Sequence, residues 1–276
     1  MEIDLKGKIA VVTGGGRGIG HEIAATLARE GVATVVTDIR PDLVDAVSAE
    51  FRREGWTGRA VACDVRDAAR IETVVHEVVD GYGRLDILVN NAGVAPGAPL
   101  EALSEEVWDL NLDVNLKGTF LMCRAVAPVM KRQRWGRIIN AASFAAIVPI
   151  VGSAPYAASK AGVHYLTRVL AGELGPWNVT VNCYAPGMIP SEMNHLREQP
   201  SGHQRRLLDT LTLRRWGVER EVANLVCFLA SDLAAYVTGT LIDVSGGKLA
   251  TQIPRLAYER AAEAGAVDPA ALDDET

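Results

Sequence analysis

The sequence has few cysteines and histidines, and neither type is grouped. The five histidines do not cluster, and the four cysteines lie far apart without a paired spacing: Cys63, Cys123, Cys183 and Cys227. Isolated thiols are typical of reduced, buried side chains rather than of a disulfide framework or a zinc site. The stretch "HEIAA" at 21–25 begins like a zinc protease motif, but Ala25 stands where the second histidine is required. We therefore expect no metal site.

A basic excess, a signal sequence and an apolar run of membrane length are also missing. The formal net charge is −6 and the basic residues are scattered, which argues against nucleic acid as the main partner. The amino terminus, "MEIDLKGKIAVVTGG", lacks a charged start followed by a long apolar stretch and a cleavage site. We expect a cytoplasmic protein with a small-molecule partner and no membrane partner. Hydrophobic residues make up 49% of the chain, enough for a sizeable core.

Short apolar, β-branched runs alternate with helical patterns along the chain. Segments such as "HEIAATLAREG" and "DAARIETVVHEVVDGYG" have helical periodicity and end on glycine, as helices often do. The apolar runs are typical of buried parallel strands: "KIAVVTG", "ATVVTD", "RAVACDV", "LDILVNN", "GRIINAA", "VTVNCYA" and "TLIDVSG". The alternation predicts an α/β fold, a doubly wound Rossmann-type sheet of seven parallel strands with helices on both faces.

The alternating series contains no linker and no internal repeat, so we expect one domain over residues 1–247. Two segments break the pattern. Residues 188–213 are polar and rich in Arg and His, and we interpret them as either a substrate lid or a partly disordered connection. Residues 248–276 form a carboxyl-terminal extension, in which "PRLAYERAAEAG" predicts a short helix and "AVDPAALDDET" is typical of a flexible end.

The first expected strand runs into the glycine turn "TGGGRGIG" at 13–20, where Gly14, Gly18 and Gly20 precede a helical pattern. Glycines let the backbone turn tightly and approach a pyrophosphate, and the helix presents its positive end to that anion. No Gly-Lys-Ser/Thr follows, so the turn is not a Walker A loop, and its spacing is G-x-x-x-G-x-G rather than G-x-G-x-x-G. The turn predicts a dinucleotide site, although a glycine turn can also simply connect a strand to a helix.

Asp38 ends the second expected strand, eighteen residues after Gly20. A carboxylate at this place can accept hydrogen bonds from the adenine ribose and would repel a 2′-phosphate, which favours NAD over NADP. Arg17 in the glycine turn and Arg40 just past Asp38 could both reach toward a phosphate, so the choice of NADP stays open.

Tyr156 and Lys160 occupy positions i and i+4 in "SAPYAASKAG", a run of small residues that should be helical. This spacing places both side chains on one helix face, so the ammonium can lie beside the phenol. A nearby cation favours the phenolate and would lower the pKa of Tyr156 from about 10, toward that of a useful general base. Alone, the pair also fits two surface residues of an alanine-rich helix.

Together, these motifs resemble the short-chain dehydrogenase/reductase family, in its single-domain branch of about 250 residues. The likeness runs from about Leu5 to Gly247, and Ser143 precedes Tyr156 by thirteen residues, as the family shows. The motifs stand in family order: the glycine turn, "CDV" with Asp64, "NNAG" at 90–93, "VNLKGTF" with Asn115, "NAAS" with Ser143, "YAASK" with Tyr156 and Lys160, and "APGMI" with Pro186 and Gly187.

The resemblance implies an oxidoreductase that transfers a hydride between NAD(H) and a secondary alcohol or ketone, with Tyr156 as general base or acid. It implies that Ser143 holds the substrate oxygen, Lys160 binds the nicotinamide ribose, and Asn115 holds a helix bend and a water. The implied cofactor contacts are Gly14, Arg17, Gly18, Ile19, Gly20, Asp38, Ile39, Asp64, Val65, Asn91, Ala92, Gly93, Tyr156, Lys160, Pro186, Gly187 and Ile189. After "APG", where the family often has a threonine for the nicotinamide amide, this chain offers Ser191.

Two other functions remain open. "LRRWG" and Arg17 also fit an NADPH-dependent ketoreductase resembling the 3-oxoacyl carrier protein reductases. A nicotinamide-binding sensor without chemistry is a third class. Such a sensor usually lacks the tyrosine or the lysine, and the complete set of Asn115, Ser143, Tyr156 and Lys160 argues against it.

The indications for the substrate conflict. Phe144, Ile147, Pro149 and Ile150 form either an apolar wall for the alcohol or a part of the core. The basic side chains of the lid either meet an anionic substrate or face solvent: His195, Arg197, His203, Arg205 and Arg206. Family members are often dimers or tetramers, so we expect a homo-oligomer, as a homotetramer or a dimer, with the helices that start near Ser104 and Ala154 in its contacts.

Overall fold

The computed structural model describes residues 3–268 and Leu272. Its centre is a seven-stranded sheet in the order β3-β2-β1-β4-β5-β6-β7, and every neighbouring pair is parallel. The strands are β1 (Ile9–Thr13), β2 (Ala33–Asp38), β3 (Gly58–Ala62), β4 (Ile87–Asn90), β5 (Gly136–Ala141), β6 (Val179–Pro186) and β7 (Leu241–Val244). Each overlaps one of the apolar runs of the sequence, and the predicted parallel Rossmann-type sheet is confirmed.

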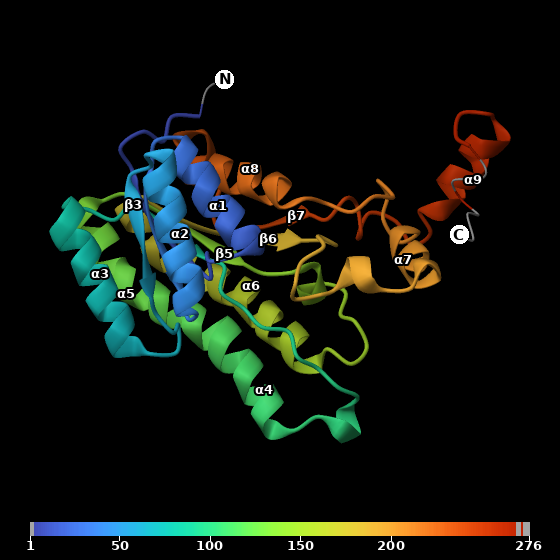
Figure 1. The fold of residues 1–276 in the computed structure, drawn as a ribbon, viewed down its shortest axis with the longest axis horizontal. Helices are drawn as coiled ribbons and strands as arrows, with labels where there is room; N and C mark the ends of the chain where they lie inside the picture. Colours follow the sequence, from blue (N-terminus) through green and yellow to red (C-terminus); the bar gives the residue numbers. More distant parts are fainter. Residues whose placement is uncertain (1–2, 269–271, 273–276) are drawn as a thin grey trace.

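Helices cover both faces of the sheet (Figure 1). Alternate residues of β1 point to opposite faces, so Ala10 and Val12 pack with α1 (Gly18–Arg29), α2 (Pro41–Glu54) and α8 (Glu219–Ala230). Ile9 and Val11 pack with α3 (Ala68–Tyr82), α5 (Gly118–Gln133) and α6 (Ala154–Leu174) on the other face. Because both faces are covered, the central strands are almost entirely buried, as continuous apolar runs require.

The local sequence explains where several helices begin and end. Asp67 caps α3 by accepting a hydrogen bond from the Arg70 amide, and Ser104 caps α4 (Glu105–Asn111) in the same way through Val107. Gly55 and Gly83 end α2 and α3 with φ of 68° and 75°, a left-handed conformation that glycine adopts without a Cβ clash. The helices expected near Ser104 and Ala154 are therefore present as α4 and α6.

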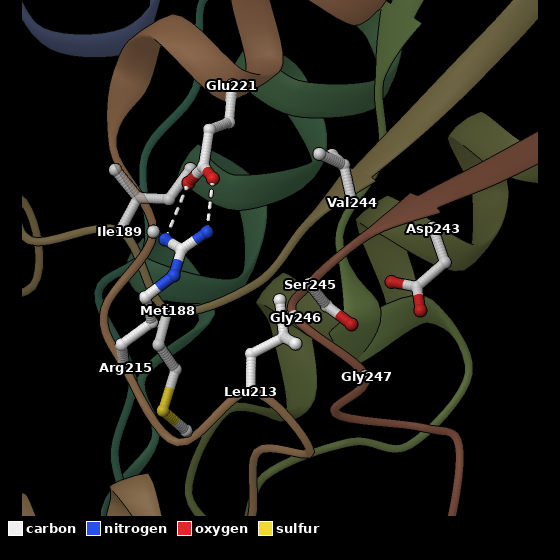
Figure 2. Close-up of a pocket in the computed structure, with 11 residues that line it drawn as sticks. Met188, Ile189, Leu213, Arg215, Glu221, Asp243, Val244, Ser245, Gly246 and Gly247 are labelled. Carbon is white, nitrogen blue, oxygen red and sulfur yellow. Dashed lines mark hydrogen bonds and ion pairs between the residues drawn. The ribbon is translucent and has the colours of Figure 1, made fainter.

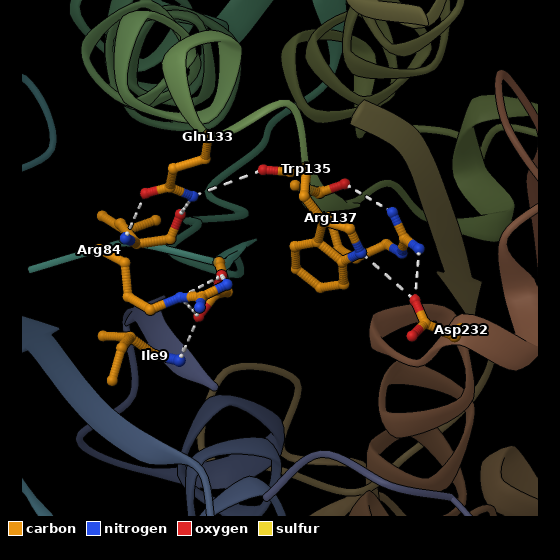
Figure 3. Close-up of polar contacts among 9 residues, drawn as sticks. Ile9, Arg84, Gln133, Trp135, Arg137 and Asp232 are labelled. Carbon is orange, nitrogen blue, oxygen red and sulfur yellow. Dashed lines mark hydrogen bonds and ion pairs between the residues drawn. The ribbon is translucent and has the colours of Figure 1, made fainter. Parts of the chain in front are cut away.

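Polar contacts fasten the edge of the sheet where the strands begin (Figure 3). The buried carboxylate of Asp86 accepts hydrogen bonds from the Ile9 amide at 2.9 Å and from the Arg84 guanidinium. On β5, the buried Arg137 donates to Asp232 at 2.9 Å and stacks 4.3 Å from the Trp135 ring centroid. These contacts fix β1, β4 and β5 at the edge opposite the candidate site.

The strand order reverses between β1 and β4, because β2 and β3 lie on one side of β1 and β5, β6 and β7 lie beyond β4. At such a point the loops that leave the carboxyl ends of neighbouring strands separate and leave a crevice for ligands. The glycine turn leaves β1 here, and the "NNAG" segment leaves β4. The fold therefore brings two of the motifs to one edge of the sheet.

The segment 188–213 leaves β6 and contains η5 (Leu196–Glu198) and α7 (Ser201–Leu208), two short helical pieces. We call it the lid. Its ends are tied down: Gly217 donates to the Met188 carbonyl at 3.0 Å, and Leu213 donates to the Gly246 carbonyl at 2.9 Å. The remaining short helices are η1 (Leu100–Ala102), η2 (Leu112–Lys117), η3 (Phe144–Ala146), η4 (Gly175–Trp177) and η6 (Asp232–Ala234).

The carboxyl-terminal extension forms α9 (Arg255–Glu263), which confirms the short helix predicted there. Figure 1 shows α9 beside α7, at the end of the molecule away from α3. Arg255 donates to Asp209 at 3.0 Å, and the Tyr258 hydroxyl donates to the Thr212 carbonyl at 2.8 Å. The flexible end predicted for "AVDPAALDDET" falls mostly outside the described residues.

Candidate active site

The glycine turn between β1 and α1 has the shape that a pyrophosphate requires. Gly14 has a φ of 59°, and a Cβ on it would stand 2.7 Å from the Ala92 Cα. Gly18 has a φ of 55°, and a Cβ there would meet open space. Helix α1 begins at Gly18 with no side-chain cap and no acidic residue in its first turn. The positive end of α1 is therefore available to an anion beside an uncrowded backbone.

Asp38 lies at the end of β2 under this turn. It is 9% exposed, and its carboxylate accepts hydrogen bonds from the amides of Gly16 at 3.0 Å and Arg40 at 3.1 Å. A Cβ on Gly16 would stand 2.7 Å from the Asp38 carboxylate, so a glycine is required at that position as well. These bonds hold the acid at the place where an adenine ribose is expected.

The two arginines that could bind the 2′-phosphate of NADP both have acidic partners. Arg17 pairs with Glu192 of the lid, and Arg40 pairs with Asp42 at the start of α2. The Asp42 carboxylate raises the pKa of Arg40, and the charges of Glu192 and Asp38 add to this. Three carboxylates therefore surround two guanidinium groups at this end of the crevice.

The "CDV" and "NNAG" segments lie at the ends of β3 and β4. The Asp64 carboxylate binds Arg66, whose guanidinium lowers the pKa of that carboxyl, and Val65 is buried against Gly118. The Asn91 side chain donates to the Gly14 carbonyl at 3.0 Å and accepts from the Tyr184 hydroxyl at 3.1 Å. The structure thus joins "NNAG" directly to the glycine turn.

Asn115 lies in η2, a π-helical segment between α4 and α5 that is the predicted helix bend. Its buried side chain accepts from the Val94 amide at 2.8 Å and donates to the Val94 carbonyl and the Ser159 hydroxyl, each at 2.9 Å. The Ser159 hydroxyl in turn donates to the Tyr156 carbonyl at 2.7 Å. The bend, the loop after β4 and the first turns of α6 therefore form one hydrogen-bonded unit.

Lys160 reaches the same place from the next turn of α6. It is buried, and its ammonium donates to the Ala141 carbonyl at 2.8 Å, at the end of β5. A Cβ on Gly93 would lie 3.2 Å from the Asn115 Oδ1 and 3.4 Å from the Lys160 Nζ, so the three residues converge. Gly162 permits the close packing of α6 on η2, because a Cβ there would stand 2.8 Å from Leu116.

The ionisation of Tyr156 corrects one expectation. The predicted effect was a lowering of the Tyr156 pKa by Lys160. In the structure, burial raises the pKa of the phenol, and a hydrogen bond with Ser143 acts in the opposite direction. The Lys160 ammonium lies 5.8 Å from the phenol ring centroid and is directed at Ala141. Burial also lowers the pKa of Lys160 to about 8. Desolvation is therefore the largest cause of the pKa shift in both side chains.

A cavity of about 210 Å³ lies between the lid and the end of β7 (Figure 2). Met188 and Ile189 enter it from the start of the lid, Leu213 from its far end, and Ser245 to Gly247 from the end of β7. Arg215 and Glu221 pair along one side. Gly187 fits against Ser245, because a Cβ on it would stand 2.5 Å from the Ser245 Cα. Pro186, Gly187 and Ile189 therefore stand at the lid's base, while Ser191 forms a turn with Asn194.

The segment between Ser143 and Tyr156 divides in two. Phe144 is buried next to Ser143, whereas Ile147 and Ile150 are 49% and 54% exposed, and Pro149 is exposed as well. These three are therefore not core residues. They form an apolar rim that follows Ser143 in the chain.

Three residues were missed by the sequence reasoning. Ser159 links Asn115 to the Tyr156 backbone, and its position three residues after Tyr156 on one helix face was a usable signal. Glu192 pairs with Arg17 across 175 positions, and Lys248 lies near Phe144 from beyond β7. Neither of these two has a local pattern that could reveal its partner.

Two absences hold for the part of the chain that the structure describes. Within residues 3–268 and Leu272, no group of three His, Cys, Asp or Glu side chains could hold a metal ion. None of the helices described there has both the length and the apolarity to cross a membrane.

Residues 8–201 match the family model described as short chain dehydrogenase. The chain is 39% identical over 244 residues to the (2S)-[(R)-hydroxy(phenyl)methyl]succinyl-CoA dehydrogenase subunit BbsD of Thauera aromatica, covering 88% of this chain and 97% of the relative. It is 40% identical over 245 residues to the 3-oxoacyl-[acyl-carrier-protein] reductase FabG of Thermotoga maritima, covering 88% and 98%.

Solved structures agree with these relatives. A putative short-chain alcohol dehydrogenase of Sinorhizobium meliloti superposes with a TM-score of 0.86 at 38% identity, covering 91% of this chain and 99% of the other. A gluconate 5-dehydrogenase of Burkholderia cenocepacia, in complex with NADP and tartrate, superposes with a TM-score of 0.87 at 33% identity, covering 91% and 98%.

Proposed function

The chain belongs to the short-chain dehydrogenase family and is an oxidoreductase, and from that premise we propose that it oxidises a secondary alcohol to a ketone with NAD⁺, or runs the reverse reaction. The observation that carries the proposal is that Asn115, Ser143, Tyr156 and Lys160 lie together at the carboxyl ends of β4 and β5. A sensor that has lost its chemistry has no need of this set, which includes a buried lysine beside a tyrosine.

The crevice fits a dinucleotide. The uncapped start of α1 and the open space at Gly18 suit a pyrophosphate, and Asp38 suits the adenine ribose. We propose that Gly14, Ile19 and Gly20 line the pyrophosphate side, and that Ile39, Asp64 and Val65 flank the adenine. Asn91, Ala92, Gly93, Pro186, Gly187 and Ile189 would line the nicotinamide side. When bound, the nicotinamide accepts or donates the hydride.

The residues of the chain move the proton. Tyr156 accepts the proton of the substrate hydroxyl during oxidation and returns it during reduction. Ser143, which forms a hydrogen bond with the phenol, donates to the substrate oxygen and favours its negative charge in the transition state. Lys160, which donates to the Ala141 carbonyl, would bind the nicotinamide ribose. Asn115 acts through Ser159 and the loop at Val94 and holds Tyr156 in position.

The cofactor preference follows from the charges at the adenine end. A 2′-phosphate would have to lie among Asp38, Asp42 and Glu192, and both nearby guanidinium groups already have carboxylate partners. Like charges in such proximity disfavour the phosphate. We therefore propose NAD as the cofactor. The second candidate, an NADPH-dependent 3-oxoacyl-type ketoreductase, is favoured by the FabG relatives and by the NADP in the structure of the Burkholderia protein.

The chain divides into a catalytic domain and an extension, and its exposed apolar faces favour assembly. We propose that residues 1–247, with the lid at 188–213, form the catalytic domain and that 248–276 are an extension to it. Apolar side chains exposed on α5 and α6, among them Phe120 at 41% and Tyr165 at 64%, favour a homotetramer or a dimer, which light scattering can measure. A cytoplasmic location stays a prediction from the amino-terminal sequence.

Turnover of an alcohol panel tests the function. Purified protein is mixed with alicyclic, steroid, polyol and hydroxyacyl secondary alcohols, and reduced-nicotinamide absorbance is followed with NAD⁺ and with NADP⁺. The proposal expects turnover with a kcat/KM that is higher for NAD⁺ than for NADP⁺. A preference for NADP⁺ would support the ketoreductase. Cofactor binding without turnover of any alcohol or of the matching ketones would contradict both enzymes and support the sensor.

A further inference from the structure

Lys248 places a positive charge between the lid and the neighbour of Ser143. It follows the Gly246-Gly247 pair at the end of β7, and its backbone amide donates to the Ser245 hydroxyl at 3.0 Å. Its half-buried ammonium donates to the Thr210 hydroxyl and lies 5.8 Å from the ring centroid of Phe144. Because Phe144 directly follows Ser143, this ammonium lies near the segment that carries the residue expected to hold the substrate oxygen.

Lys248 differs from the other cations around the lid. Arg214 and Arg255 share the Asp209 carboxylate, Arg215 pairs with Glu221, and Arg17 pairs with Glu192. The lid cations Arg197 and Arg206 are exposed to solvent, whereas Arg205 is half-buried like Lys248. Of these two half-buried cations, Lys248 is the one that lies over the Phe144 ring. Among the residues that the structure describes, Lys248 is half-buried, and its ammonium contacts a hydroxyl and an aromatic ring but no carboxylate.

A half-buried ammonium is usually stabilised by a carboxylate, and the described residues around Lys248 do not supply one. Partial removal from water disfavours the charged form, and burial lowers the pKa of Lys248. A hydroxyl and an aromatic face offset only part of that cost. An anion brought by a ligand would complete the pair, and its hydrogen bond to a cation would be stronger than one between neutral groups.

We propose that Lys248 binds a carboxylate of the substrate, so that the alcohol is a hydroxy acid and its product the matching keto acid. The apolar rim at Ile147 and Ile150 would contact the carbon skeleton, while Lys248 would hold the acid end. This assignment rests on the proposed function, because it places the carbinol between Ser143 and Tyr156. It also accounts for an apolar rim and a cation in one site without any role for the solvent-facing lid arginines.

Matched pairs of substrates test the assignment. The 2-, 3- and 4-hydroxy acids of four to six carbons are compared with their primary amides in wild type, Lys248→Gln and Lys248→Arg. Wild type should prefer the acid of at least one pair, and Lys248→Gln should reduce kcat/KM for that acid by about 10- to 100-fold while changing that of its amide little. Lys248→Arg should recover part of the loss. An equal loss for acid and amide, or a wild-type preference for the amide in every pair, would overturn the assignment.

Arg206→Gln is the matched control, since it removes a solvent-facing charge from the same lid. It should leave the ratio of acid to amide near the wild-type value. If the ratio of acid to amide falls as far in Arg206→Gln as in Lys248→Gln, the effect comes from the overall charge of the lid. That result would overturn a specific contact between Lys248 and the carboxylate.

A binding measurement separates this inference from the proposed function. Thermal unfolding is followed with butyrate, butyramide and inorganic phosphate, which need no turnover. Butyrate should raise the Tm of wild type but not of Lys248→Gln, whereas butyramide should raise neither. This result would support the carboxylate site even if no alcohol reacted. A failure of every alcohol to react would contradict only the proposed function. Stabilisation by phosphate without any by butyrate would overturn a carboxylate site.

Discussion

At the scale of single residues, the chemistry depends on side chains whose surroundings the sequence indicates only in part. Tyr156 and Lys160 could be paired from their i, i+4 spacing, and Asp38 could be placed from its position after an apolar run. The direction of the Tyr156 pKa could not be predicted, because it depends on burial among distant elements. Glu192 and Lys248 could not be found either, since their partners lie 175 and more than 30 residues away in sequence.

The contact of Arg17 with Glu192 predicts a role in cofactor choice. Glu192→Gln removes one of the carboxylates near the expected 2′-phosphate and leaves Arg17 without its acidic partner. We expect kcat/KM for NADP⁺ to rise about 5- to 10-fold while that for NAD⁺ changes less than about twofold. Glu198→Gln, which removes another exposed lid carboxylate, serves as the control. An unchanged NADP⁺ value in Glu192→Gln would contradict the role assigned to this pair.

The burial of Lys160 predicts a conflict between stability and activity. Lys160→Met should lower turnover by about 100-fold or more, yet raise the free energy of unfolding by about 1–3 kcal/mol, because it removes a desolvated charge. Lys117→Met, at an exposed lysine, should change neither much. Denaturant unfolding and steady-state kinetics measure both quantities, and a large loss of stability in Lys160→Met would contradict this account.

The same variant has a predictable pH dependence. The folded-state pKa of Lys160 is about 8, below its ordinary value of 10.5, so between these values the unfolded chain holds a proton that the folded chain has released. Wild-type stability therefore rises with pH through this window relative to Lys160→Met. The advantage of the variant should be largest below pH 8 and shrink toward pH 10.5. A constant difference would mean that Lys160 titrates normally.

At the scale of elements, the strands and most helices can be predicted from the sequence, but the π-helical segment η2 cannot. The apolar runs predict all seven strands. The five inner strands are buried on both faces of the sheet, whereas the edge strands β3 and β7 are only partly buried. The bend at Asn115 was implied by resemblance, but no residue pattern shows that a π-helical segment spans Leu112–Lys117. Asn115 in this segment accepts a hydrogen bond from the Val94 amide and donates to the Ser159 hydroxyl, and these bonds arise only when α6 and the loop after β4 are in place.

Asn115 and Asn111 make a matched pair for testing this unit. Both are fully buried, but Asn111 bonds to the Pro96 and Val107 carbonyls, whereas Asn115 reaches Ser159 and thereby Tyr156. Either substitution by alanine should lower the free energy of unfolding by about 1–3 kcal/mol. Only Asn115→Ala should also lower kcat by about 10-fold or more at a temperature where both variants are folded. Equal kcat values in the two variants would show that Asn115 has only a structural role.

At the scale of the whole molecule, helix α9 of the extension contacts the lid. Helix α9 contacts the end of the lid through Arg255 and Tyr258. The lid's own ends are held by the bonds from Gly217 to Met188 and from Leu213 to Gly246. The sequence predicted a short helix here but not what it touches, because contacts between Asp209 and Arg255 depend on how two polar segments fold back on each other. This arrangement makes the extension a support for the lid.

Weakening that support should affect substrate binding more than chemistry. The double variant Arg255→Gln, Tyr258→Phe removes the bonds to Asp209 and Thr212 and should raise the KM of the alcohol about 3- to 10-fold. The kcat and the affinity for NAD⁺ should stay near wild type. Arg260→Gln, elsewhere on α9, is the control. A lower affinity for NAD⁺ with an unchanged KM for the alcohol would contradict the link between extension and lid.

The proposed reaction depends on Tyr156 as the residue that moves the proton. The most direct measurement mixes enzyme, NAD⁺ and an alcohol that the panel has identified, and follows reduced-nicotinamide absorbance in a single turnover for wild type and Tyr156→Phe. We predict that the variant binds NAD⁺ as tightly as wild type and stays folded, but forms reduced nicotinamide at least about 100-fold more slowly. Hydride transfer at a wild-type rate in Tyr156→Phe would contradict the central claim.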